Sequence, residues 1–180
     1  MKVLSIEHSQ FTYWADFAVY LAAVLVLPWA LFLWAPPSAR AGMGVGVLAG
    51  ALSWSFVEYA MHRLVFHGIE PFLRHGEHHR RPDALVATPT VLSLVMIAGL
   101  FWFPATVLTD RWVGSAATLG LTAGYFTYGV VHHALHHWRA RGAWMLRRKK
   151  LHAFHHRSPQ VNYGVTMSWW DGVFGTYKAP

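Results

Sequence analysis

The hydrophobic and polar positions of this chain occur in long blocks, so that apolar stretches are separated by short polar segments. Residues 17–39, 84–109 and 112–131 contain no Asp, Glu, Lys or Arg, and residues 41–57 are uncharged up to Glu58. A helix of about 20 apolar residues crosses the roughly 30 Å hydrocarbon core of a bilayer. The pattern therefore predicts four transmembrane helices, at about residues 15–35, 41–61, 88–108 and 112–132.

Composition favours a membrane protein over a soluble helical bundle. Hydrophobic residues make up 54% of the chain and charged residues 13%, and the charged share is about half of the roughly 25% typical of soluble domains. We expect an all-α integral membrane protein with four transmembrane helices and a cytosolic histidine-rich helical cap. Residues 1–180 are predicted to form this single membrane-embedded domain.

The N-terminal apolar run has two features of a signal peptide, a preceding Lys2 and the small-x-small sequence Ala39-Arg40-Ala41. However, Glu7 and Asp16 do not fit a positively charged leader, and the apolar run is longer than such a leader needs. We therefore expect the first helix to be a retained anchor.

The basic residues predict the orientation in the membrane. With a cytosolic N-terminus, thirteen of the fifteen Lys and Arg lie in the inside segments 1–16, 61–87 and 132–180. The positive-inside rule then predicts a multi-pass protein with its N- and C-termini in the cytosol. All thirteen histidines lie on that cytosolic face, so segments far apart in the sequence can meet there in one active site.

Twelve of the thirteen histidines fall in four clusters: His62 and His67; His75, His78 and His79; His132, His133, His136 and His137; and His152, His155 and His156. Imidazole is the commonest metal-ligand side chain. With no cysteine in the chain, Fe–S clusters and cysteine-ligated zinc are excluded. We predict a multinuclear metal site held by the cytosolic segments 62–87 and 132–180.

The spacing within the clusters is mostly that of one helix face, i, i+3 and i+4. His62 and His67 are the exception, because a separation of five residues puts them about 140° apart on a regular helix. A local unwinding before Gly68 would bring both inward. The third cluster offers two competing i, i+4 pairs, which differ by about 100° of rotation: His132 with His136, and His133 with His137.

The motifs around these histidines resemble the fatty acid hydroxylase superfamily, whose members include fatty acid 2-hydroxylases and sterol oxidases. The resemblance runs from about Glu58 to Tyr177, with the motifs in the family's order. They are Glu58-Tyr59-x-x-His62-Arg63-x-x-Phe66-His67, His75-Gly76-x-His78-His79-x-x-Pro82, His132-x-x-x-His136-His137, His152-x-x-His155-His156, Asn162-Tyr163-Gly164 and Trp170-Asp171-x-x-Phe174-Gly175-Thr176.

The resemblance implies an integral membrane oxygenase with a dinuclear iron centre that uses O2 as co-substrate, and zinc is expected to replace iron in overexpressed protein. His133 and His137 fall outside the family's ligand pattern. The ten implied ligands are His62, His67, His75, His78, His79, His132, His136, His152, His155 and His156.

Three polar residues are predicted to orient the ligand rings. Glu58 lies one turn before His62, and Asn162 and Asp171 follow the last cluster. The alternatives are a surface acid for Glu58 and a turn residue for Asp171.

The predicted activity is the hydroxylation of a lipid, most simply a fatty acyl chain that enters from the bilayer. Hydroxylating an unactivated C–H bond needs O2 reduced at a redox metal, and the electrons are expected from an external cytochrome b5-like protein or ferredoxin. The basic strip Arg147-Arg148-Lys149-Lys150 would attract such an acidic carrier or, alternatively, anionic lipid headgroups. No nucleic-acid-reading motif is present, and nucleic acid is not an expected partner.

Related histidine patterns also serve carotenoid and sterol hydroxylases or desaturases, and the residues do not separate these substrates. Two other classes are less compatible with the sequence. A bis-histidine haem protein would place paired histidines inside the bilayer. A metal transporter would carry acidic ligands near the middle of its membrane helices.

Overall fold

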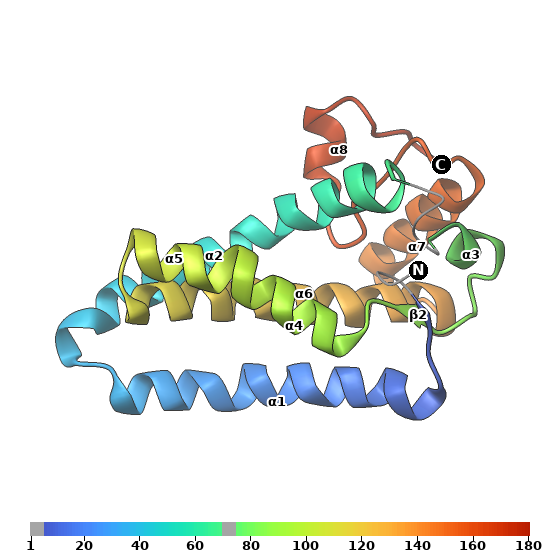
Figure 1. The fold of residues 1–180 in the computed structure, drawn as a ribbon. Helices are drawn as coiled ribbons and strands as arrows, with labels where there is room; N and C mark the ends of the chain where they lie inside the picture. The colour runs from blue at the N-terminus through green and yellow to red at the C-terminus, as the bar shows by residue number, and fades with distance from the viewer. Residues whose placement is uncertain (1–5, 70–74) are drawn as a thin grey trace. The chain divides into compact units, whose positions relative to one another are not determined.

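The computed structural model describes residues 6–69 and 75–180 and is mostly helical (Figure 1). The apolar blocks of the sequence form long helices, because a helix satisfies its own backbone hydrogen bonds away from water. The elements are β1 (Ile6–Glu7), α1 (Gln10–Trp34), η1 (Pro37–Ala39), α2 (Arg40–Ala60), η2 (Met61–Phe66), α3 (His75–Arg80), β2 (Val86–Ala87), α4 (Thr90–Ile97), η3 (Ala98–Trp102), α5 (Phe103–Leu108), α6 (Arg111–His137), α7 (Gly142–Arg157) and α8 (Trp169–Val173).

Three segments of the described chain are long and apolar enough to cross a membrane: Gln10–Trp34, Pro37–Phe66 and Thr90–Leu108. Each overlaps one of the first three predicted crossings. The fourth prediction corresponds to α6, whose 27 residues give it the length. The polar side chains of Ser115, Thr118 and Thr122 make α6 less apolar than the other three, so three candidate crossings, and not four, are evident among the described residues.

The chain forms two compact units. The apolar unit comprises residues 8–54 and 88–126 and is built from α1, most of α2, α4, η3, α5 and the first half of α6. The histidine unit comprises residues 55–87 and 127–180 together with β1, within the described ranges, and it carries twelve of the thirteen histidines.

Within the apolar unit, α2 and α6 cross in close backbone contact. A Cβ added to Gly50 would lie 1.8 Å from the carbonyl oxygen of Ala117, and one added to Gly120 would lie 2.0 Å from that of Val47. Such small-residue crossings are typical of membrane helices, where packing and not the hydrophobic effect drives association. A buried hydrogen bond of 2.6 Å between the hydroxyls of Tyr20 and Ser93 joins α1 to α4.

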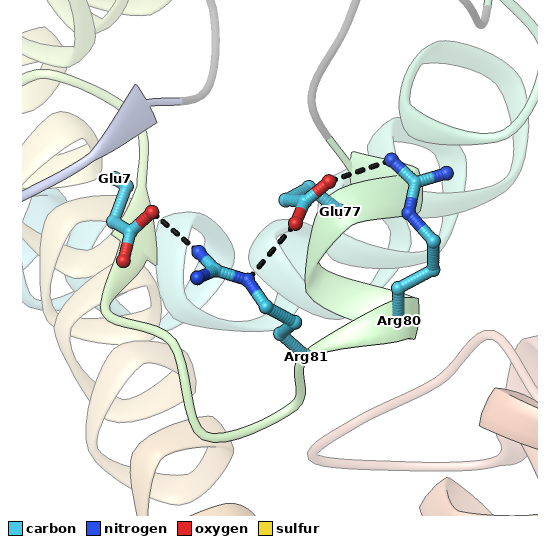
Figure 2. Close-up of polar contacts among 4 residues, drawn as sticks. All are labelled: Glu7, Glu77, Arg80 and Arg81. Atoms are coloured by element: carbon cyan, nitrogen blue, oxygen red, sulfur yellow. Dashed lines mark hydrogen bonds and ion pairs between the residues drawn. The ribbon is translucent and has the colours of Figure 1, made fainter.

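Within the histidine unit, a two-residue antiparallel ladder pairs β1 with β2. Ion pairs among four charged side chains also link β1 to α3 and the residue that follows it (Figure 2). Glu77 accepts from Arg80 at 2.6 Å and from the Nε of Arg81 at 2.9 Å, and Arg81 also pairs with Glu7. These contacts fasten the strand to the short helix that carries the second histidine cluster.

We expect Gly50→Ala to destabilise the protein, because the added methyl group meets backbone atoms of α6 that cannot move independently. Overpacking of this kind costs about 1–3 kcal/mol. Gly44→Ala on the same helix is the matched control, since a Cβ there meets nothing within 4 Å. Thermal unfolding in detergent micelles checks the pair, and equal midpoints for the two variants would show that the α2–α6 crossing is not as close as described.

Candidate metal centre

Four parts of the histidine unit carry the clustered histidines. These are η2 with the residue that follows it, α3, the last turns of α6, and α7. Because α3 and α7 are regular helices, their histidines at i, i+3 and i+4 share a face.

A π-helix brings His62 and His67 together. In η2 the backbone N–H of His67 donates to the carbonyl of His62 at 3.1 Å, which closes a turn five residues apart. A π turn is wider than an α turn, so residues i and i+5 lie on the same side of the chain. The two ring centroids are 5.1 Å apart. The expected departure from the α-helix is therefore present, as a wider turn and not as an unwound end.

Five histidines form a first group in which the ligand atoms all lie within 4.8 Å of one another: His62, His67, His75, His79 and His155. The Nε2 atom of His75 is 3.1 Å from those of His62 and His67. It is 3.2 Å from the Nε2 of His79. The Nε2 atoms of His67 and His155 are also 3.1 Å apart.

Four histidines form a second group with the same spread: His78, His136, His152 and His156. The Nε2 of His152 lies 2.8 Å from that of His136 and 3.2 Å from that of His156. His78 is buried, and neither of its ring nitrogens has a hydrogen-bond partner among the described residues. The rings of His79 and His156 stack at 4.3 Å, so the two groups are adjacent.

The third cluster divides between the site and its surroundings. His132 lies beside the second group, with ring centroids 4.7 Å from His78 and 4.9 Å from His136, but its nitrogens are not among the convergent ones. His133 and His137 stack on each other at 4.4 Å, outside both groups. The structure thus brings nine of the ten expected ligands into two groups and places the tenth in ring contact.

Backbone carbonyls determine the tautomers of two rings. The Nδ1–H of His62 donates to the carbonyl of Tyr163 at 2.5 Å, and that of His155 donates to the carbonyl of Val161 at 2.7 Å. A carbonyl can only accept, so each ring carries its proton on Nδ1. The lone pair of each Nε2 therefore faces the first group, as in histidines whose second nitrogen is anchored for metal binding.

The geometry of both groups fits a metal ion. Nitrogen ligands about 2.1 Å from one ion are about 3.0–3.4 Å apart when adjacent and about 4.2 Å apart when opposite. The observed Nε2 separations are 2.8–3.2 Å between neighbours, within a spread of 4.8 Å. Lone pairs directed at one another at this distance repel unless a cation lies between them. Imidazole donor sets suit zinc, copper, iron and nickel.

The carbonyls that orient these rings belong to a loop, residues 161–168, which two buried carboxylates hold. Glu58 accepts from the backbone N–H groups of Val165 at 2.6 Å and Thr166 at 2.9 Å. Asp171 accepts from those of Tyr163 at 2.8 Å and Gly164 at 2.9 Å. Glu58 and Asp171 are therefore buried anchors of the loop, and not a surface acid and a simple turn residue.

Arg148 holds the same loop from α7. Its buried guanidinium donates to the hydroxyl of Ser168 at 2.7 Å and to the carbonyl of Gly164 at 3.2 Å. Its charge interacts with those of Glu58 and Asp171. Arg148 consequently does not belong to the exposed basic strip expected from the sequence.

Asn162 anchors the start of the loop to the C-terminal segment. Its amide nitrogen donates to the carbonyl of Lys178 and its amide oxygen accepts from the backbone N–H of Lys178, both at 2.9 Å. The residue adopts a φ of 56°, a left-handed conformation that asparagine tolerates better than most residues. These contacts place Asn162 next to Val161 and do not direct its side chain at a histidine.

Burial keeps the histidines of the centre neutral. It lowers the pKa of His67 and His156 to about 4, with repulsion from His79 adding to the effect in each. It lowers the pKa of His136 and His155 to about 3. Neutral imidazole is the form that binds metal, so these rings are in their ligating form at neutral pH.

The carbonyl acceptors at Val161 and Tyr163 cannot be identified from the sequence, because every residue has a carbonyl and only the fold shows which ones meet a histidine. Arg148 belongs to a run of four cations in the sequence, and such a run does not show which of its members is buried. The i, i+5 spacing of His62 and His67 did contain a signal for the π-helix.

Comparison with known proteins gives a family model, fatty acid hydroxylase, that matches residues 47–176. A dihydroceramide fatty acyl 2-hydroxylase of Arabidopsis thaliana is 33% identical over 146 residues, which cover 74% of this chain and 61% of that protein. The fatty acid 2-hydroxylase of Homo sapiens is 31% identical over 144 residues, 72% of this chain and 38% of that protein. The chain thus spans less than two thirds of the length of either relative.

A solved structure is also similar. The visible hydroxylase domain of full-length scs7p superimposes with a TM-score of 0.78 at 27% sequence identity, covering 94% of this chain and 67% of that chain. The matched range, residues 47–176, contains all twelve clustered histidines, Glu58, Asn162 and Asp171. This chain belongs to the fatty acid hydroxylase family.

Proposed function

We propose that this protein is a membrane-bound, O2-dependent di-iron oxygenase that adds a hydroxyl group to carbon 2 of a fatty acyl chain. The observation that carries the proposal is the convergence of nine histidines in two adjacent groups, each with metal-ligand spacing. The names of the relatives, fatty acyl and fatty acid 2-hydroxylases, support the substrate and the position on it.

In this proposal the first group holds one iron and the second group holds the other, with His132 completing the second. Bound iron would supply the redox chemistry that reduces O2, which protein side chains cannot provide. One C–H bond, one O2, two electrons and two protons give the alcohol and one water. The 161–168 loop keeps the Nε2 lone pairs of His62 and His155 directed at the first position.

The electrons come from an external one-electron carrier, either a cytochrome b5-like protein or a ferredoxin. Lys150 remains exposed on α7, and its charge supports an acidic carrier. We further propose that α6 is a fourth membrane crossing. Both termini and the histidine centre then lie on the cytosolic face, as the distribution of Lys and Arg indicates.

We expect two metal ions per chain, one for each histidine group, with iron in active protein and partial zinc in overexpressed protein. His136→Ala and His132→Ala should abolish hydroxylation and lower the metal content. His133→Ala and His137→Ala are the matched controls, because this pair stacks outside both groups, and they should retain metal. Elemental analysis and product analysis of the four variants show which i, i+4 pair binds metal. If only His133→Ala loses metal, the ligands are His133 and His137 and the proposed pair is wrong.

The stability of the metal-free protein should fall as the pH is lowered from about 7 towards 4. The histidine pKa values are about 3 to 4 in the folded chain, against 6.5 as the ordinary value. Below pH 6.5 the unfolded chain therefore binds more protons than the folded one, and unfolding is favoured. Unfolding midpoints measured in detergent at pH 8, 7, 6 and 5 should decrease stepwise below pH 7. A flat series would contradict neutral, buried imidazoles.

Asp171→Asn should weaken metal binding, because the amide has one oxygen where the carboxylate accepts from two loop N–H groups through both of its oxygens. Loss of a group that orients a ligand typically lowers metal affinity about 10–100-fold. Competition with a chelator measures the effect on purified protein. Asp110→Asn is the matched control, since Asp110 lies in the apolar unit and accepts from the backbone N–H groups of Trp112 at 2.7 Å and Val113 at 3.0 Å. An equal loss in both variants would argue against an orienting role for Asp171.

A further inference from the structure

Helix α8 carries an exposed apolar surface on the histidine unit. The α8 patch consists of Met167, Trp169 and Val173, and all three side chains are exposed. Trp169 is 65% exposed and Val173 69%, and their i, i+4 spacing puts them on one face of the short helix. Exposed aromatic and aliphatic side chains gathered in this way indicate a surface that another phase or molecule covers.

The opposite side of α8 packs on the last turns of α2. The indole N–H of Trp170 donates to the hydroxyl of Ser55 at 3.1 Å, and its ring contacts that of Phe56 at 5.0 Å. The ring of Phe174 stacks on Tyr59 at 5.3 Å. Figure 1 shows α8 (red) beside this part of α2. The position of α8 relative to a membrane is therefore determined by that of residues 55–59 of α2.

Those residues lie near the end of a candidate membrane crossing, Pro37–Phe66. At 1.5 Å per residue, its 30 residues span about 45 Å, which equals the hydrocarbon core plus both headgroup regions. About 20 residues counted from the charged Arg40 cross the core and reach approximately residue 60. Phe56 and Tyr59 therefore lie where the hydrocarbon core meets the headgroups, and α8 lies beside them at the same depth.

The charges and aromatic groups around the patch match that boundary. Arg147 is exposed, and its guanidinium lies 3.5 Å from the hydroxyl of Tyr177, three residues after Phe174. Trp and Tyr concentrate at the headgroup level of bilayers, and Arg and Lys at that level attract anionic lipids. A soluble partner protein would bind a surface that faces water, whereas this patch lies at the level of the lipid headgroups.

We propose that the α8 patch inserts into the headgroup–acyl boundary of the bilayer and binds phospholipid there. The patch then anchors the 161–168 loop at the membrane surface, because Asp171 of α8 accepts from the N–H groups of Tyr163 and Gly164. The proposal depends on the membrane crossing of α2 and does not depend on the hydroxylase activity.

Site-directed spin labelling tests this directly, because the chain contains no cysteine. Val173→Cys and, as the aqueous control, Arg80→Cys carry the nitroxide, since both positions are exposed. The 180-residue chain, loaded with diamagnetic zinc, is placed in bilayers of phosphatidylcholine and phosphatidylglycerol. Power saturation then measures collisions with O2, which dissolves in lipid, and with a nickel chelate, which stays in water.

At position 173 we expect a several-fold excess of oxygen over nickel-chelate collisions, and the reverse at position 80. A label at Trp169→Cys, on the same face of α8, should give the same result as the label at position 173. This second variant replaces the first if Val173→Cys folds poorly. Frequent nickel-chelate collisions at 173 and 169 would overturn the proposal by showing an aqueous surface. Rare collisions with both reagents would also overturn it, because the patch would then be covered by protein, either a partner or a second copy.

Discussion

The arrangement of the metal centre depends on the hydrogen bonds that two buried carboxylates accept from one loop. Glu58 comes from α2 and Asp171 from α8, and together they bind four consecutive backbone N–H groups, those of residues 163–166. Buried N–H groups without partners are costly, and bonds to a carboxylate are stronger than bonds to a neutral acceptor. The loop is therefore held at both sides, and its carbonyls orient His62 and His155.

The close fit of this loop leaves little freedom at its centre. A Cβ on Gly164 would lie 1.8 Å from the carbonyl oxygen of Met167 and 2.9 Å from a carboxylate oxygen of Asp171, so this position requires glycine. Arg148 places one cation against the two anions. This arrangement explains how Glu58 can be buried near the end of a candidate membrane crossing, since acids at such depth need charged or hydrogen-bonding partners.

The close approach of the histidine nitrogens and the lowered pKa values of these histidines have the same physical cause. Packing five and four imidazoles into two small volumes removes water and brings potential charges together, and both effects favour the neutral ring. A neutral ring with its Nδ1–H bound to a carbonyl offers one lone pair, and this lone pair faces the other histidines. The fold therefore presents neutral imidazole nitrogens at both positions, and the free energy of ion binding would also stabilise the fold.

The sequence by itself determined the class of this protein. The lengths of the uncharged blocks predicted long apolar helices, the histidine spacing predicted shared helix faces on α3 and α7, and the motif order led to the family. These features are local, because periodicity and composition act over a few turns. Only the tertiary structure decided which carbonyls orient His62 and His155, that Arg148 is buried while Arg147 is exposed, and that His62 and His67 meet through a π turn. The carbonyl partners and the burial of Arg148 depend on contacts between segments that are far apart in the sequence, which side-chain pattern does not show. The i, i+5 spacing of His62 and His67 indicated a departure from the α-helix, and the structure shows that this departure is a π turn.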